Sequence, residues 1–206
     1  MLVVASRPGF VEPAAMILEG LVTTITPDGR LHVAAMGPWI ADDERATGRI
    51  TRLVLRPFAT SQTAEHFART GCGVFHATDD ALLVAQVVTG ARAAPPPSRP
   101  ATAVAGRVLD DACRAWEFAI DRADRSQERH ELSARVVAEH AGRPFLGFNR
   151  AAHAVVEGAI LATRVHLLGD AEVGRRLEDL RVLVDKTGGP REREAFALLE
   201  AFVRGG

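Results

Sequence analysis

The fold of this chain is organised around residues 50–63, with the sequence ITRLVLRPFATSQT. Ile50–Leu55 is apolar and partly β-branched, which favours a strand. Pro57 ends that strand, because proline cannot donate a hydrogen bond to a sheet ladder. Thr60 and Ser61 then offer two hydroxyls that can cap a following helix. The stretch therefore predicts a strand that runs directly into a helix start.

The start of this helix, predicted over Gln62–Arg69, carries groups that suit an anion. A helix N-terminus exposes unpaired N–H groups and a partial positive charge. Arg56 stands just before it, and Thr60, Ser61 and Thr63 add hydroxyls, a set that can hold a phosphate dianion. The same residues also fit a capped surface helix with an incidental arginine. The local pattern alone favours this second interpretation, because short motifs often match by chance.

The composition is that of an ordinary soluble globular protein. The chain has 206 residues, of which 47% are hydrophobic and 25% charged, and its formal net charge is −1. A charge this close to zero provides no basic field for nucleic acid or an anionic membrane. Two isolated cysteines, Cys72 and Cys113, are too few for a disulfide framework or a zinc site. The start lacks a signal-peptide pattern, and no run approaches the roughly 20 apolar residues that span a bilayer. We therefore expect a cytoplasmic protein with no nucleic-acid or membrane partner.

The N-terminal part alternates strand and turn signals. Met1–Pro13 contains a glycine and two prolines and predicts a loose arm. Met16–Thr26 is rich in β-branched residues and predicts one strand, which the Pro27-Asp28-Gly29 turn joins to a partner strand over Leu31–Met36. Asp42–Gly48 is polar and predicts an exposed loop.

A second strand and helix follow the helix at 62–69. Val74–Thr78 predicts the strand. Asp79 and Asp80 suit the start of a helix over Ala81–Val88, both as caps and because acidic groups stabilise a helix N-terminus. Ala91–Ala101 contains four prolines and predicts a stiff linker or exposed loop without a regular element.

The next segment has the period of β-strands. In Ala112–Arg122, Trp116, Phe118 and Ile120 fall on one face, which indicates a half-buried antiparallel strand. Glu131–His140 alternates in the same way, so the two segments are expected to pair as a long hairpin.

The C-terminal part has the period of helices. Asn149 can cap a helix over Arg150–Leu168. A second helix is expected to begin at Asp170 and a third at Pro190, where proline fits the first turn. The chain is therefore β-rich in its first two thirds and helical afterwards.

Several short motifs accompany this order of elements. They are Leu55-Arg56-Pro57-Phe58, then Thr60, Thr63 and Glu65, then Thr70-Gly71, Thr78-Asp79-Asp80, Gly147-Phe148-Asn149-Arg150-Ala151 and Ala159-Ile160-Leu161-Ala162-Thr163-Arg164. Together they resemble the DUF447 family of the flavin-reductase-like FMN-binding split barrel superfamily. The resemblance extends roughly from Met16 to Val203.

This resemblance implies an α+β fold, an antiparallel split β-barrel with a helical C-terminal region. It divides the chain into an N-terminal arm (1–15), a split-barrel FMN-binding domain (16–146) that includes the proline-rich loop (91–101), and a C-terminal helical region (147–206).

The resemblance also implies a cofactor and a site. FMN is expected at the interface of a homodimer, with its phosphate at the predicted helix start and its ring along the strand over Val33–Gly37. The resemblance thereby raises the phosphate interpretation above that of a plain surface helix. The implied cofactor-binding residues are Arg56, Thr60, Ser61, Thr63, Ala35, Met36, Gly37, Asn149 and Arg150.

The aromatic residues depart from the family pattern. The chain contains no tyrosine, and Phe58 and Ala64 stand where many relatives are expected to have tyrosine or another aromatic residue. Any ring that stacks on the flavin must therefore come from Trp39 or a phenylalanine.

The predicted helix from Arg150 carries a polar stripe. At about 100° per residue, Arg150, His153, Glu157 and Arg164 lie within about 60° of one another. The stripe is either a solvated face or a charged wall over the flavin pocket, in which His153 is available for proton transfer.

Other candidate residues favour structural roles. We interpret His32 and His76 as strand residues, His66 as a surface residue of the short helix, and Cys72 as a buried inert thiol. No two histidines have zinc-binding spacing with a third ligand, so we expect no metal. The chain has no G-x-S-x-G, P-loop or G-x-G-x-x-G motif, which argues against triad hydrolases, P-loop enzymes and Rossmann dinucleotide-binding proteins.

The leading hypothesis is an FMN-dependent oxidoreductase that passes electrons from a reduced donor to a small organic acceptor. Family resemblance adds a link to pterin-dependent one-carbon metabolism. The alternatives are a flavin-binding protein without turnover and a structural or assembly dimer with a degenerate flavin site. The residues alone assign no catalytic group.

Overall fold

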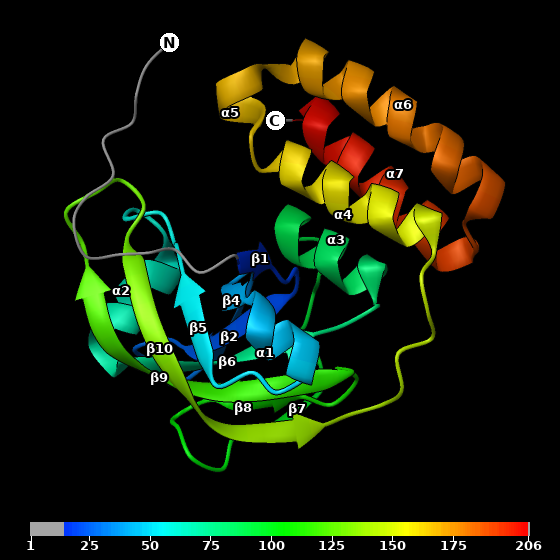
Figure 1. Cartoon of the computed structure of the whole chain (residues 1–206). Helices are drawn as coiled ribbons and strands as arrows, with labels where there is room; N and C mark the ends of the chain where they lie inside the picture. The colour runs from blue at the N-terminus through cyan, green and yellow to red at the C-terminus, as the bar shows by residue number, and fades with distance from the viewer. Residues whose placement is uncertain (1–14, 206) are drawn as a thin grey trace, which may run out of the picture.

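An eight-stranded antiparallel sheet that curls into a half-barrel forms the centre of the molecule (Figure 1). The computed structural model describes residues 15–205, so the arm predicted over Met1–Pro13 lies outside the described residues. The strand order is β1-β4-β5-β10-β9-β6-β2-β3. The strands are β1 (Ala15–Ile17), β2 (Leu21–Ile25), β3 (Leu31–Ala35), β4 (Trp39–Ala41), β5 (Arg52–Leu55), β6 (Cys72–Ala77), β9 (Arg114–Asp124) and β10 (Glu131–Ala141). The predicted split barrel followed by helices is confirmed.

Strand β5 and the helix after it confirm the interpretation of residues 50–63. β5 pairs with β10 on one side and with β4 on the other, and Leu53 and Leu55 are fully buried. Helix α2 (Gln62–Thr70) follows, with Ser61 as its N-cap and Gly71 as its left-handed C-cap. This junction sets where the first turn of α2 lies relative to the sheet.

The interior of the half-barrel is filled mainly by large apolar side chains. Phe67 of α2 meets Phe118 of β9 edge to face, with ring centroids 5.7 Å apart. Phe75 stacks on Trp116 at the same separation. Gly73 is required beside them, because an added Cβ would come within 2.9 Å of the Phe118 ring. These contacts fix α2 against the sheet.

The β9–β10 hairpin confirms the predicted alternation of apolar and polar residues. At one position, however, both faces of the hairpin are buried. Glu117 points away from the barrel interior, yet it is fully buried. It accepts hydrogen bonds from the amides of Thr102, Ala103 and Val104 at 2.6–3.0 Å and pairs with His140. Burial acts to raise the pKa of Glu117, but these hydrogen bonds outweigh it and hold the pKa at about 2.

Two predictions for the N-terminal part are wrong. Met16–Thr26 is two strands, β1 and β2, because the chain changes neighbours at Gly20. An added Cβ on Gly20 would lie 2.3 Å from the His76 carbonyl oxygen. Asp42–Gly48 is not a loop: α1 (Asp42–Thr47) forms there, with three acidic residues in its first turn and Gly48 as a left-handed cap.

Two further predictions need correction. The proline-rich segment 91–101 contains a short strand, β7 (Ser98–Pro100), which pairs with β8 (Arg107–Leu109). Proline is tolerated there because β7 has no second neighbour. The helix predicted over Arg150–Leu168 is interrupted after Ala162 and continues as a single turn, so it forms two helices. They are α4 (Arg150–Ala162) and α5 (Val165–Leu168).

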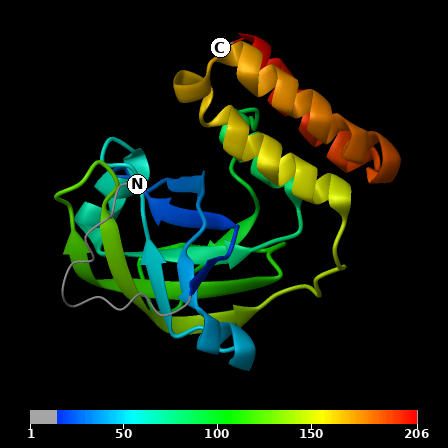
Figure 2. The same ribbon diagram turned by 45° about the horizontal axis from the view of Figure 1, so that its top comes forward.

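The C-terminal helices do not form a separate core. Helices α4 and α7 (Pro190–Gly205) pack against α3 (Ala81–Thr89), which belongs to the first part of the chain, and α6 (Asp170–Thr187) packs on α4 and α7 (Figures 1 and 2). Gly158 of α4 allows close packing, since an added Cβ would lie 3.1 Å from both Leu177 and Leu199. The predicted domain boundary after residue 146 stays a prediction. Helix α3 lies before this boundary in the sequence but packs against helices that lie after it. None of the described helices is both long and apolar enough to cross a membrane.

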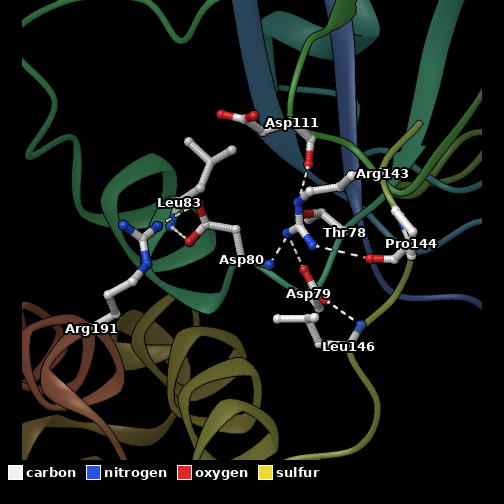
Figure 3. Close-up of polar contacts among 9 residues, drawn as sticks. All are labelled: Thr78, Asp79, Asp80, Leu83, Asp111, Arg143, Pro144, Leu146 and Arg191. Carbon is white, nitrogen blue, oxygen red and sulfur yellow. Dashed lines mark hydrogen bonds and ion pairs between the residues drawn. The ribbon is translucent and has the colours of Figure 1, made fainter.

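Two adjacent carboxylates tie the sheet to these helices (Figure 3). Asp80 caps α3 by accepting from the Leu83 amide at 3.1 Å, and it pairs with Arg191 of α7 at 2.7 Å. Asp79 forms an ion pair with Arg143 and accepts from the Leu146 amide at 3.0 Å. The predicted cap is confirmed for Asp80, whereas Asp79 holds the segment that leads from β10 to α4.

His76 gives the fold a pH dependence that can be measured. It is fully buried, shares a 3.3 Å hydrogen bond with the Leu21 carbonyl, and accepts from the Leu109 amide at 3.0 Å. Burial lowers its pKa from 6.5 to about 4. Between these values the unfolded chain binds the proton and the native protein does not, so stability falls as the pH falls. We expect a loss of about 3 kcal/mol from this group between neutral pH and about pH 4.

The measurement is urea unfolding of the wild type and His76→Gln at several pH values. A glutamine can accept from Leu109 and donate to Leu21 but does not titrate in this range. The variant should lose stability less steeply on acidification. Equal pH dependence of the two proteins would contradict the assignment.

Candidate functional site

The first turn of α2 presents unpaired backbone donors. Ser61 Oγ accepts from the Ala64 amide at 3.2 Å and donates to the Phe58 carbonyl at 2.7 Å. Within residues 15–205, the amides of Gln62 and Thr63 donate no hydrogen bond. Unpaired N–H groups at a helix start attract anions. The unpaired N–H groups predicted for this helix start are therefore present. The Ser61 hydroxyl, by contrast, is engaged in capping the helix.

Arg56 lies beside this segment but is already engaged. Its guanidinium pairs with Glu131 of β10 at 2.8 Å and lies 5.2 Å from the centre of the Trp39 ring. Arg129 packs 3.9 Å from the centre of the Phe58 ring and donates to the Arg56 carbonyl. These pairs hold the chain between β5 and α2 in place. The positive charge of Arg56 is partly neutralised by Glu131.

A pair of histidines lies next to the first turn of α2. His32 Nε2 and Thr63 Oγ1 share a hydrogen bond at 3.2 Å, and His66 Nδ1 and Thr24 Oγ1 share one at 2.8 Å. The two imidazole rings meet edge to face with centroids 4.9 Å apart. The interpretation of His66 as a surface residue is wrong. Its side chain is 3% exposed, because α2 packs this face against β2.

The other predicted strand site lies at the far end of β3, which is an edge strand of the described sheet. Ala35 is exposed, and Met36 donates to the Gly20 carbonyl at 3.1 Å. Gly37 is packed against the β1–β2 connection, where an added Cβ would lie 2.4 Å from Ile17 and 3.0 Å from the Glu19 carboxylate. The backbone after β3 is therefore open to solvent on one side and tightly packed on the other.

Two residues of the predicted polar stripe, Glu157 on α4 and Arg164 just after it, act on the Glu19 carboxyl beside this end of β3. Arg150, His153, Glu157 and Arg164 are all exposed. Burial and then the charge of Glu157 raise the pKa of the Glu19 carboxyl, while Arg164 lowers it. Glu157 and Arg164 are thus close enough to act on Glu19, and the described residues place a mixed group of charges between α4 and the barrel.

Asn149 and Arg150 lie away from the other predicted site residues. Asn149 caps α4 by accepting from the Ala151 and Ala152 amides, and its side chain donates to the Thr187 carbonyl. The first turn of α4 and helix α2 lie on opposite sides of the molecule in both views (Figures 1 and 2). One chain therefore does not bring Asn149 and Arg150 to the α2 start.

Two cavities lie elsewhere in the monomer. The larger, of about 260 Å³, lies beside the β3 edge and α3, and the smaller, of about 50 Å³, lies at the start of α3. Neither is lined by a predicted site residue. The α2 start instead offers backbone donors, hydroxyls and imidazoles, a set of groups that can bind an anion.

Sequence reasoning missed the contact between His32 and the α2 start. The Pro-Asp-Gly turn fixes the hairpin register and sets Thr24 opposite His32. That register places the two side chains on the same face of the sheet. The packing of α2 over that face, which brings His66 and Thr63 to them, is a long-range contact without a local signal.

Solved structures of other proteins are similar in fold to this chain. The crystal structure of an FMN-bound DUF447 protein from Methanosarcina mazei is 20% identical, with a TM-score of 0.74 over 90% of this chain and 94% of that chain. The flavin reductase of styrene monooxygenase from Pseudomonas putida is 14% identical, with a TM-score of 0.49 over 64% of this chain and 83% of that one. The second likeness is too remote to support an argument. No curated protein matches this sequence.

Family models cover most of the chain. The model described as "Protein of unknown function (DUF447) N-terminal domain" matches residues 18–143. The model described as "Protein of unknown function (DUF447)" matches residues 149–201. These matches agree with the motifs of the sequence and with the likeness in fold, and the chain therefore belongs to the DUF447 family.

Proposed function

We propose that this protein binds FMN as a homodimer and uses it to pass electrons from a reduced donor to a small organic acceptor. The observation that carries the proposal is the pair of unpaired amides on Gln62 and Thr63, at the place where the family resemblance puts the flavin phosphate. The relative whose fold matches 90% of this chain is FMN-bound, which supports the same cofactor here.

The residues present fit the two ends of FMN. Thr60 is exposed and offers a hydroxyl beside the two amides, which suits a phosphate. From His32 to Met36 the chain advances ~14 Å in strand conformation. This path leads from the α2 start to the exposed backbone near Ala35. A phosphate and a flavin ring can therefore contact the same edge strand at its opposite ends.

A dimer is part of the proposal because one chain leaves the site open. Neither of the two cavities described above is lined by a residue of the α2 start, and the first turn of α4, which contains Arg150, is remote from α2 within the monomer. A second copy that covers the β3 edge would enclose the ring and exclude water from it. The link to pterin-dependent one-carbon metabolism rests on the family resemblance and stays a prediction.

The flavin, when bound, would supply the chemistry of hydride and electron transfer. The residues of this chain would bind and orient it. The first turn of α2 would hold the phosphate, and the backbone of residues 35–37 would approach the ring. The charged groups of α4 and Glu19 would face the region where an acceptor enters. No side chain is required to form a covalent intermediate.

A visible absorption spectrum followed by an activity assay tests the function. The purified protein should either carry FMN or take up added FMN, with the absorption bands of a bound flavin. It should then oxidise NADH or NADPH in the presence of a small acceptor such as a quinone. A protein that does not bind added FMN would exclude the proposal. Binding without turnover with any acceptor would instead indicate a flavin carrier or sensor.

A carboxylate at the helix start should compete with the phosphate. We expect Thr60→Asp to weaken FMN binding about tenfold or more, because the new charge repels the phosphate dianion. Ala171→Asp is the matched control, since it adds the same charge to the first turn of α6. Quenching of flavin fluorescence gives both affinities. Equal FMN affinities for the two variants would place the phosphate elsewhere.

The polar stripe of α4 can be tested separately. If Arg150 and Glu157 form a wall of the acceptor site, each alanine variant should lower turnover about threefold or more. Glu178→Ala, on the exposed side of α6, serves as the control. Nicotinamide oxidation and FMN affinity are measured together. Wild-type values for both variants would mean that the stripe is a solvated face.

A further inference from the structure

The hairpin of β2 and β3 brings an imidazole to the first turn of α2. His32 stands opposite Thr24 in the hairpin register, and its Nε2 lies 3.2 Å from Thr63 Oγ1. Thr63 is 4% exposed, and its amide is one of the two unpaired donors at the helix start. His32 therefore contacts a residue that contributes both a backbone and a side-chain donor to this turn.

The ring of His32 is held by a second, buried histidine. His66 is 3% exposed and Thr24 is 1% exposed, and their 2.8 Å hydrogen bond fixes the plane of the His66 ring. The His66 ring meets His32 edge to face. This contact restricts the rotation of His32 and keeps its Nε2 directed at Thr63. Such rigid support is a feature of binding residues whose geometry matters.

The hydrogen bond between His32 and Thr63 restricts the direction in which the Thr63 hydroxyl can donate. When Nε2 carries its hydrogen, it donates to Thr63 Oγ1, and the hydroxyl hydrogen must then point to another acceptor. A phosphate oxygen at the unpaired amides of Gln62 and Thr63 is such an acceptor. Arg56 supplies only part of the charge, because it is paired with Glu131.

We propose that His32 is a phosphate-binding residue of the flavin site. It orients the Thr63 hydroxyl toward the phosphate and, when protonated, adds the positive charge that favours a phosphorylated flavin over riboflavin. His66 is the positioning residue that holds its ring. This inference rests on the proposed function, since it concerns the same site.

The charges around His32 make its interaction with the phosphate dependent on pH. Burial and then His66 lower the pKa of His32, so the ring is neutral near pH 7 in the ligand-free protein. The pKa of His66 is lowered by burial and by Arg69, and raised by Glu65. These groups belong to α2, and β2 contributes the neutral Thr24. A bound dianion would raise the pKa of His32, so FMN binding would take up a proton.

The experiment compares FMN with riboflavin at different pH values. Dissociation constants are measured by flavin fluorescence between about pH 6.5 and about pH 8.5, where the phosphate stays mainly dianionic. Wild-type affinity for FMN should fall about fivefold or more toward the higher pH, as His32 loses the proton. Riboflavin lacks the phosphate, so its affinity should change little.

Two variants decide the assignment. His32→Gln can still donate to Thr63 but does not titrate, so it should bind FMN with a flat pH profile and discriminate less between FMN and riboflavin. His166→Gln, on the exposed helix α5, should keep the wild-type profile. FMN binding with the same pH dependence in wild type and His32→Gln would overturn the inference and leave the proposed function intact. No FMN binding by the wild type would overturn both.

Discussion

The position of the first turn of α2 is the constraint on which the candidate site depends. A helix start leaves N–H groups without partners, and a protein must satisfy them or expose them to solvent or a ligand. Here Ser61 satisfies the Ala64 amide, while Gln62 and Thr63 stay unpaired among the described residues. The short connection from β5 sets that turn close to the sheet, and Phe67 anchors it in the barrel core. The open donors are thus held on a rigid support.

The helices at the C-terminus depend on a different contact. Helix α3 packs against α4 and α7, and its residues belong to the same apolar cluster as Leu21 of the sheet. This apolar cluster therefore extends across the boundary between the two family models, while the barrel interior forms a second cluster. Asp79 and Asp80 reinforce this contact from adjacent positions, one through Arg143 and the other through Arg191.

The distribution of charge around the site follows from these contacts. Arg56, which precedes the α2 start, is paired with Glu131. The half-buried His32 and the buried His66 lie next to Thr63. At the other end of β3, the Glu19 carboxyl is under the influence of Glu157 of α4 and of Arg164, which precedes α5. One end of the strand thus presents hydrogen-bond donors, and the other presents a mixed group of carboxylates and a guanidinium. This polarity matches a ligand that has an anionic end and an uncharged ring.

Most of the local elements could be predicted from the sequence alone. Ser61, Asp80 and Asn149 were identified as caps because their side chains act on amides two or three residues away. The Pro-Asp-Gly turn set the β2–β3 pairing, and alternating residues predicted the β9–β10 hairpin for the same local reason. Motifs distributed along the chain were sufficient to identify the family. They also identified the segment that carries the unpaired amides.

Contacts between groups far apart in the sequence could be identified only from the folded structure. The burial of Glu117 beneath residues 102–104, the pairing of Arg56 with Glu131 and the contact of His32 with Thr63 each join segments far apart in sequence. The break at Gly20 likewise depends on the neighbouring carbonyl of His76. Periodicity and capping report only on the nearest turns of the chain, because their hydrogen bonds are local. Long-range contacts depend on how the whole sheet curls and on where α2 and α3 pack against it.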